Sequence, residues 1–139
     1  MTTSTLGLFF PHSAETKGIV VRVAVSYLDD QSEPARQRWF WAYHIRIENG
    51  GEREVQLLTR RWLITDGRGD RHRVEGEGVV GVQPVIEPGG SYDYVSGCPL
   101  DTPEGTMEGS YQMIDAEGRL FNVAIPRFPL AGPVWDKGA

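Results

Sequence analysis

Apolar and polar residues alternate along much of this chain, which is the period of a β-strand with one buried face. The alternation is clearest over residues 39–48, where every second position is apolar: Trp39, Trp41, Tyr43, Ile45 and Ile47. Residues 19–27 alternate in the same way, with valine and isoleucine at most of the apolar positions. Both segments are therefore predicted to be half-buried strands.

Further segments carry a strand-like pattern, and turn-forming residues separate them. They are residues 55–65, 71–74, 92–96, 107–113 and 121–125. In the first of these the pattern places Leu58, Trp62 and Ile64 on one face, with Arg60 in step between them. Pro126 is expected to end the last strand. About seven strands separated by turns predict an all-β protein, an immunoglobulin-like or fibronectin type III-like β-sandwich.

The strand pattern covers one stretch of the chain and therefore predicts one domain, residues 18–130. Residues 1–17 are mostly small and polar without a clear period, so we expect a flexible N-terminal tail. Residues 131–139 are expected to form a C-terminal tail.

Composition narrows the function classes. The net charge of −5 argues against nucleic acid or an anionic membrane as the main partner. No window of the sequence approaches the ~18–20 apolar residues that span a bilayer. The single cysteine, Cys98, excludes an intramolecular disulfide and fits a reducing cytoplasm.

A glycine-rich run has the spacing G-x-G-x-x-G, at Gly76, Gly78 and Gly81. In a dinucleotide-binding domain this motif opens a helix, but Pro84 and the residues after it forbid one here. Glu75 and Glu77 also place carboxylates beside the supposed phosphate site. The favoured interpretation is a bulge or a tight crossing between strands, and the alternative is a backbone nest for phosphate.

Arginines form the densest positive cluster of this acidic chain: Arg60, Arg61, Arg68, Arg71 and Arg73. Hairpin geometry would bring Arg60 or Arg61 near Arg71 or Arg73 on one face. One interpretation is a solvated sheet face with ion pairs to Glu52, Glu54 or Glu75, and the other is a patch for an anion or an acidic peptide.

Neither metal chemistry nor catalysis has a convincing signal. The three histidines, His12, His44 and His72, lie far apart, and there is only one thiol, so no metal site and no cofactor are expected. Ser96 and Cys98 have no adjacent histidine or orienting carboxylate in sequence. We therefore expect a protein that is not an enzyme.

A long, dispersed set of motifs carries a family resemblance. The segments are Trp41-Ala42-Tyr43-x-Ile45-x-Ile47-x-Asn49, Val55-Gln56-Leu57-Leu58-x-Arg60-x-Trp62-x-Ile64-Thr65-Asp66, Val74-x-Gly76-x-Gly78-Val79-Val80-Gly81-x-Gln83-Pro84, and Thr102-Pro103-x-Gly105-x-Met107-x-Gly109-x-Tyr111-x-Met113. Across residues 18–130 the chain resembles the bacterial ApaG family.

The resemblance implies a fibronectin type III-like sandwich in a stand-alone cytoplasmic protein associated with cobalt resistance and magnesium efflux. Similar domains are fused to an F-box protein and to a DNA-polymerase-interacting protein, where binding other proteins is the implied task. Family members often carry Arg-His-Trp where this chain has Arg60-Arg61-Trp62, so no metal role for that histidine carries over.

Two functions remain open. The first is a non-enzymatic domain that binds an unidentified protein partner through Arg60, Arg61, Arg71, Arg73, Gly76, Gly78 and Gly81. The alternative is a small-ligand sensor that binds a nucleotide or polyphosphate at the Gly76–Gly81 loop. The pattern allows either a monomer or a homodimer, because unprotected edge strands of a sandwich invite pairing.

Overall fold

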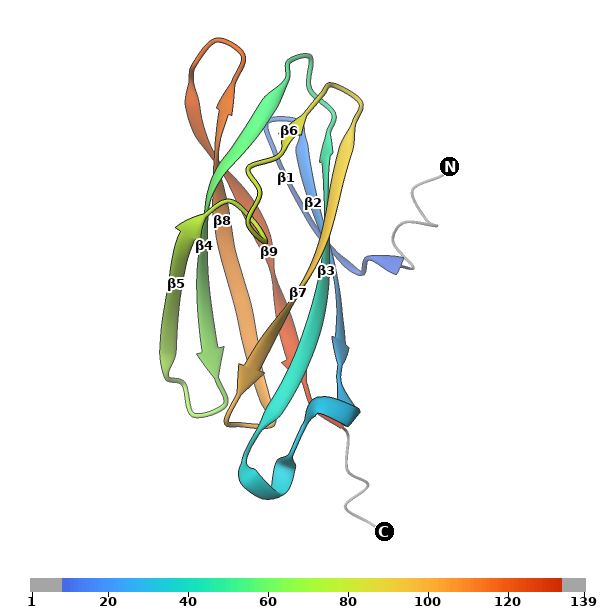
Figure 1. Ribbon diagram of the computed structural model, residues 1–139, viewed down its shortest axis with the longest axis vertical. Coiled ribbons are helices and arrows are strands. Elements are labelled where there is room, and N and C mark those ends of the chain that lie inside the picture. Colours follow the sequence, from blue (N-terminus) through green and yellow to red (C-terminus); the bar gives the residue numbers. More distant parts are fainter. Residues whose placement is uncertain (1–8, 134–139) are drawn as a thin grey trace.

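Two antiparallel β-sheets pack face to face in the computed structural model, which describes residues 9–133 (Figure 1). The first sheet has the strand order β1-β2-β3-β7, and the second has β5-β4-β8-β9 with β6 beside β4. The strands are β1 (His12–Thr16), β2 (Ile19–Tyr27), β3 (Trp39–Asn49), β4 (Val55–Asp66), β5 (Arg71–Glu77), β6 (Val85–Ile86), β7 (Ser91–Leu100), β8 (Glu104–Asp115) and β9 (Leu120–Ala131). The short 3₁₀ helices η1 (Asp29–Gln31) and η2 (Pro34–Arg36) lie between β2 and β3. This architecture confirms the predicted all-β sandwich.

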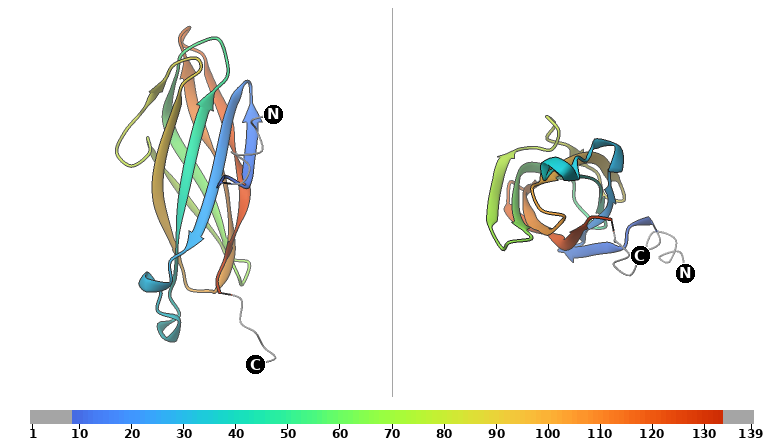
Figure 2. Two further views of the ribbon diagram at one scale, coloured as in Figure 1. Left: turned by 90° about the vertical axis from the view of Figure 1, so that its right-hand side faces the viewer. Right: turned by 90° about the horizontal axis from the view of Figure 1, so that it is seen from below.

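The alternation in the sequence produces the core between the sheets. Figure 2 shows the first sheet face-on, with its four strands side by side. Every second residue of β2 and β3 points inward, and Val21, Val23, Ile45 and Ile47 are fully buried. Burying each such side chain stabilises the fold by about 1.5–3 kcal/mol. The core therefore follows directly from the period of two.

The described residues form two strands more than the pattern predicted, β1 and β6. The prediction of a flexible tail was wrong for residues 12–16, which pair with β2 from His12 opposite Val23 to Thr16 opposite Ile19. Lys17 and Gly18 between them both adopt positive φ, the geometry of a two-residue hairpin turn. Residues 1–8 and 134–139, the rest of the two predicted tails, lie outside the described residues.

A β-bulge in β4 corrects the predicted face of that strand. The register with β8 shifts between Leu57 and Thr59, so Leu58 has no partner there. Leu57 is therefore the buried residue, and Leu58 does not share a face with Trp62. Arg60 lies beyond the bulge and two residues before Trp62, so its side chain points to the same inward face as Trp62.

The last strand continues through proline, contrary to prediction. β9 passes Pro126 and Pro129 and ends at Ala131. The register of β8 with β9 shifts between Met107 and Gly109, and this irregularity accommodates Pro126. β9 is also an edge strand of its sheet, where a missing N–H costs least.

The two long sides of the sandwich differ. On one side β1 approaches β9, and the amide N–H of Ala124 donates a hydrogen bond of 3.1 Å to Thr16 Oγ1. On the other side β5 pairs only with β4 and β7 only with β3, so neither edge is joined across the gap between the sheets. Within residues 9–133, no helix has the length and apolar character to span a membrane.

Candidate functional site

The arginines predicted to form one surface are divided between the two faces of the β4–β5 hairpin. Arg60 lies opposite Gly76 in the inward phase, whereas Arg61 lies opposite Glu75 in the outward phase. Arg71 and Arg73 share the outward phase with Arg61, since all three are an even number of register positions apart. Arg61 Nε lies 3.8 Å from Glu75 Oε1, one of the ion pairs that the sequence suggested.

Arg60 has an internal role. Its Nη1 donates hydrogen bonds of 3.0 Å to the carbonyl oxygens of Glu77 and Gly78. Burial raises the pKa of the Tyr94 and Tyr111 hydroxyls, which hydrogen-bond to each other, and the positive charge of Arg60 partly opposes this rise. Arg60 therefore braces the inner side of the hairpin.

The glycine run is explained by backbone geometry. A Cβ on Gly76 would lie 2.8 Å from Arg60 Nη1, so glycine leaves room for the guanidinium. Gly78 adopts a φ of +63°, and a Cβ there would overlap the carbonyl oxygen of Val82. The tight turn that follows buries Val79, and Gly81 at its tip adopts a φ of +78°.

Three backbone amides of this turn, those of Gly78, Val79 and Val82, are already used in hydrogen bonds within the chain. The N–H of Gly78 donates to Leu58 O at 2.8 Å, and the N–H of Val79 donates to Val82 O at 2.8 Å. The N–H of Val82 donates back to Val79 O at 3.0 Å. The glycine run therefore forms a tight crossing between strands that is anchored on the β4 bulge. This agrees with the favoured interpretation of the glycine motif, a bulge or tight crossing.

A cleft of about 750 Å³ opens at the end of the sandwich beside this hairpin, and it was not among the sites predicted from the sequence. Its size is that of a typical ligand or anchor pocket. Apolar side chains from three separate parts of the chain line it: Trp39, Phe40, Ile64, Pro99 and Leu100. Polar and charged residues complete the lining: Gln31, Glu33, Arg36, Gln37, Arg38, His72 and Asp101.

Two arginines and two carboxylates lie among the residues that line the cleft, and the two arginines differ in their ion pairs. Arg36 Nε lies 3.5 Å from Glu33 Oε2, and Arg68 Nη2 lies 2.7 Å from Asp101 Oδ2. Arg38 is exposed and makes no ion pair with any residue from 9 to 133. Among the charged side chains that line the cleft, Arg38 therefore presents a guanidinium without an ion-pair partner in residues 9–133, beside an apolar floor.

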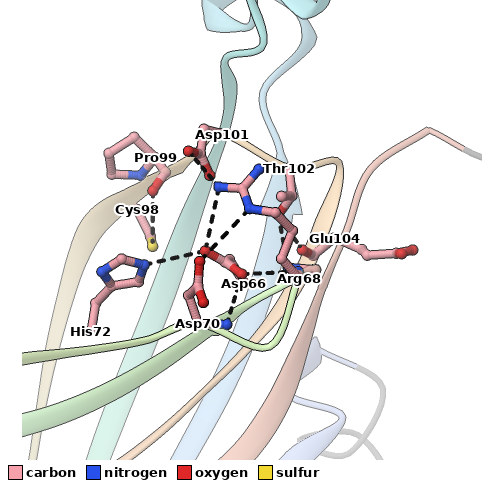
Figure 3. Close-up of polar contacts among 10 residues, drawn as sticks. Asp66, Arg68, Asp70, His72, Cys98, Pro99, Asp101, Thr102 and Glu104 are labelled. Carbon is pink, nitrogen blue, oxygen red and sulfur yellow. Dashed lines mark hydrogen bonds and ion pairs between the residues drawn. The ribbon is translucent and has the colours of Figure 1, made fainter.

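A polar corner centred on Asp66 supports one wall of the cleft (Figure 3). The Asp66 carboxylate accepts hydrogen bonds from the backbone N–H groups of Arg68 at 2.9 Å and Asp70 at 3.1 Å. His72 Nε2 lies 3.3 Å from its other oxygen. Burial opposes ionisation of this carboxylate, but these hydrogen bonds outweigh burial and lower its pKa. The corner holds the β4–β5 turn rigid.

The same corner is tied to the next turn of the chain. The N–H of Gly67 donates to Thr102 Oγ1 at 2.9 Å, and this hydroxyl donates to Glu104 O at 2.8 Å. The β4–β5 turn and the turn between β7 and β8 are thus tied together by short polar contacts.

Cys98 lies in the same region, and its environment is that of an unreactive thiol (Figure 3). Burial raises the pKa of this thiol to about 11, so it is protonated at neutral pH, and its Sγ lies 3.7 Å from the carbonyl oxygen of Pro99. A nucleophilic cysteine requires a lowered pKa, not a raised one. Over residues 9–133, no three His, Cys, Asp or Glu side chains are grouped to hold a metal ion.

Known proteins are similar to this chain over most of its length. Residues 29–115 match the model of the ApaG domain. Protein ApaG of Methylobacterium sp. (strain 4-46) is 51% identical over 122 residues, which cover 88% of this chain and 94% of that relative. Protein ApaG of Afipia carboxidovorans is 52% identical over the same coverage.

A solved structure agrees with these sequences. The crystal structure of an ApaA protein from Bordetella pertussis has 44% identity and a TM-score of 0.80, covering 83% of this chain and 94% of that one. The family model spans more than half of this chain, and the relatives are matched along nearly their whole length. The protein belongs to the ApaG family.

Proposed function

We propose that this protein is a non-enzymatic binding domain that captures an extended segment of another protein in the end cleft. The observation that carries the proposal is the apolar floor of Trp39, Ile64 and Leu100 beneath the unpaired, exposed Arg38 of the rim, as judged over the described residues. Protein interfaces commonly combine an apolar centre, which receives an anchor side chain, with a polar rim.

The chemistry of the cleft specifies the kind of segment. An apolar anchor would cover the floor, and an acidic residue next to it would pair with Arg38. We favour the cleft over the arginine and glycine surface predicted from the sequence, because Arg60, Gly76 and Gly78 stabilise the β4–β5 hairpin itself. The association with cobalt resistance and magnesium efflux that the resemblance implies would then be exerted through the captured protein.

Comparative affinity capture from the native host tests the proposal. The tagged chain and its Arg38→Glu variant are used as baits, and the retained proteins are quantified by mass spectrometry. Reversal of this rim charge is expected to reduce one specific partner by about ten-fold, which corresponds to about 1.4 kcal/mol. Thermal stability is expected to stay unchanged because the Arg38 side chain is exposed.

Arg127→Glu provides the matched control. This residue lies on β9, its side chain is 68% exposed, and it carries the same charge change away from the cleft. Full retention of every partner by Arg38→Glu, or equal loss with both variants, contradicts the assignment of the cleft.

A further inference from the structure

β5 is an exposed edge strand at the margin of the molecule (Figure 1). Six of its seven residues are exposed, and only Gly76 is partly covered. Its single backbone partner is β4. An edge of this kind offers a row of unpaired N–H and C=O groups to another strand.

The residues whose backbone groups face outward can be identified. The N–H of Asp66 donates to Asp70 O at 2.9 Å, and the N–H of Gly78 donates to Leu58 O at 2.8 Å. Bonded pairs alternate along an antiparallel ladder, so the even-numbered residues of β5 exchange hydrogen bonds with β4. The backbone groups of Arg71, Arg73, Glu75 and Glu77 therefore point toward the free edge, and of these the Glu77 carbonyl also accepts a hydrogen bond from Arg60.

These four residues also carry the charges of the strand, in the order positive, positive, negative, negative around Val74. If a second copy of β5 pairs antiparallel about Val74, Arg73 lies opposite Glu75 and Arg71 lies opposite Glu77. Every cross-strand charge pair is then of opposite sign. The same register joins outward-facing backbone groups only to outward-facing ones, so the hydrogen-bond pattern and the charge pattern agree.

Neighbouring registers lack this agreement. A shift by two residues in one direction places Arg73 opposite its own copy, and the opposite shift does the same to Glu75. Parallel pairing in register also sets like charges side by side, which is destabilising. The charges that protect this edge from unrelated strands thus select one register with a second copy.

The contacts within the chain leave the charged side chains of β5 available for pairing with a second copy. Across the described residues, Arg71, Arg73 and Glu77 make no ion pair, and Glu75 has only Arg61 at 3.8 Å. On the inner face Val74 is 40% exposed and would meet its own copy at the two-fold axis. His72 would lie opposite Gly76, where the Arg60 guanidinium occupies the space next to the glycine.

We propose that two copies of this protein form a symmetric homodimer by antiparallel pairing of β5 with β5, which joins their β4-containing sheets into one continuous sheet. The seam is short, so the dimer belongs to the weak class of small interfaces. It does not depend on the proposed capture of a partner, because Arg38 lies outside the seam and His72 is the one β5 residue that also lines the cleft.

Two variants of the full chain test the proposal, and we call them half-swapped because each reverses the charges in one half of β5. The first carries Arg71→Glu and Arg73→Glu, and the second carries Glu75→Arg and Glu77→Arg. Sedimentation velocity from about 10 µM to about 1 mM brackets the affinity expected of a seam this small. The natural chain is expected to dimerise in this range, whereas each variant alone is expected to dimerise at least about ten-fold more weakly.

Mixing the two half-swapped variants provides the decisive result. One β5 then carries only negative and the other only positive charges, so an equimolar mixture is expected to form a heterodimer of natural affinity that weakens at high salt. Thermal melts of each variant check that it is folded. A natural chain that stays monomeric throughout, half-swapped variants that dimerise as well as it does, or a mixture that forms no heterodimer overturns the proposal.

Discussion

Replacing Gly78 with alanine is expected to destabilise the fold by about 3 kcal/mol, whereas the same replacement at Gly81 is expected to cost about 1 kcal/mol. Both glycines belong to the run 76–81 and both adopt a left-handed φ, +63° at Gly78 and +78° at Gly81. The pair therefore shares the conformational cost of a Cβ and differs only in what that Cβ meets.

The difference follows from the surroundings of the two positions. No atom lies within 4 Å of a Cβ on Gly81, so only the left-handed conformation is penalised, by about 1 kcal/mol. A Cβ on Gly78 would also displace the carbonyl of Val82. The backbone of Val82 closes the turn through two hydrogen bonds with Val79, one accepted by its carbonyl and one donated by its N–H. Losing both bonds adds about 1 kcal/mol each.

Equilibrium urea unfolding followed by tryptophan fluorescence measures both costs, because Trp41 and Trp62 are buried in the core. A fold of this size has about 5–15 kcal/mol of stability, so both variants should remain folded in water. Equal costs at the two positions, or no cost at Gly78, would refute the structural explanation of the glycine run.

Four further outcomes are expected. Val80→Gly should stabilise the fold by about 1 kcal/mol in the same urea assay, because Val80 is a β-branched residue at a φ of +47°. The lowered pKa of Asp66 stabilises the fold above its ordinary value of 3.8, and this contribution should disappear as pH falls below that value toward the native pKa. Asp66→Asn should therefore flatten the acid limb of stability against pH, whereas Asp70→Asn, at an exposed carboxylate, serves as control. Cys98 should react with iodoacetamide at pH 8 far more slowly in the native state than in urea, because burial raises the pKa of its thiol to about 11. Thermal-shift titration with ATP or diadenosine tetraphosphate should give flat curves at millimolar ligand, since the amides of Gly78, Val79 and Val82 in the glycine turn are already bonded.

The sandwich could be predicted from the sequence because alternation is a local property. Each half-buried strand displays its own inward face, as β3 does from Trp39 to Asn49. β1 was missed because it is a short polar strand, and its pairing depends on β2. Leu58 and Pro126 were misassigned for a related reason, since both lie at bulges that only the neighbouring strand defines.

The candidate site was less predictable than the fold. The sequence marked Arg60 as basic, but the bulge at Leu58 sets the side of the sheet to which it points. The cleft joins residues 31–40 to residues 64–72 and 99–101, which lie far apart along the chain. No local pattern records that proximity, although the aromatic pair Trp39 and Phe40 directly after a polar loop was a usable hint.

Photo-crosslinking in the native host tests the central claim, capture of a protein at the end cleft, most directly. A photoreactive phenylalanine replaces Gln31 at the rim of the cleft or, as control, the exposed Leu120 outside the cleft. The account predicts a specific covalent adduct with one protein from position 31 and none from position 120. Absence of any adduct from position 31, or the same adducts from both positions, would contradict it.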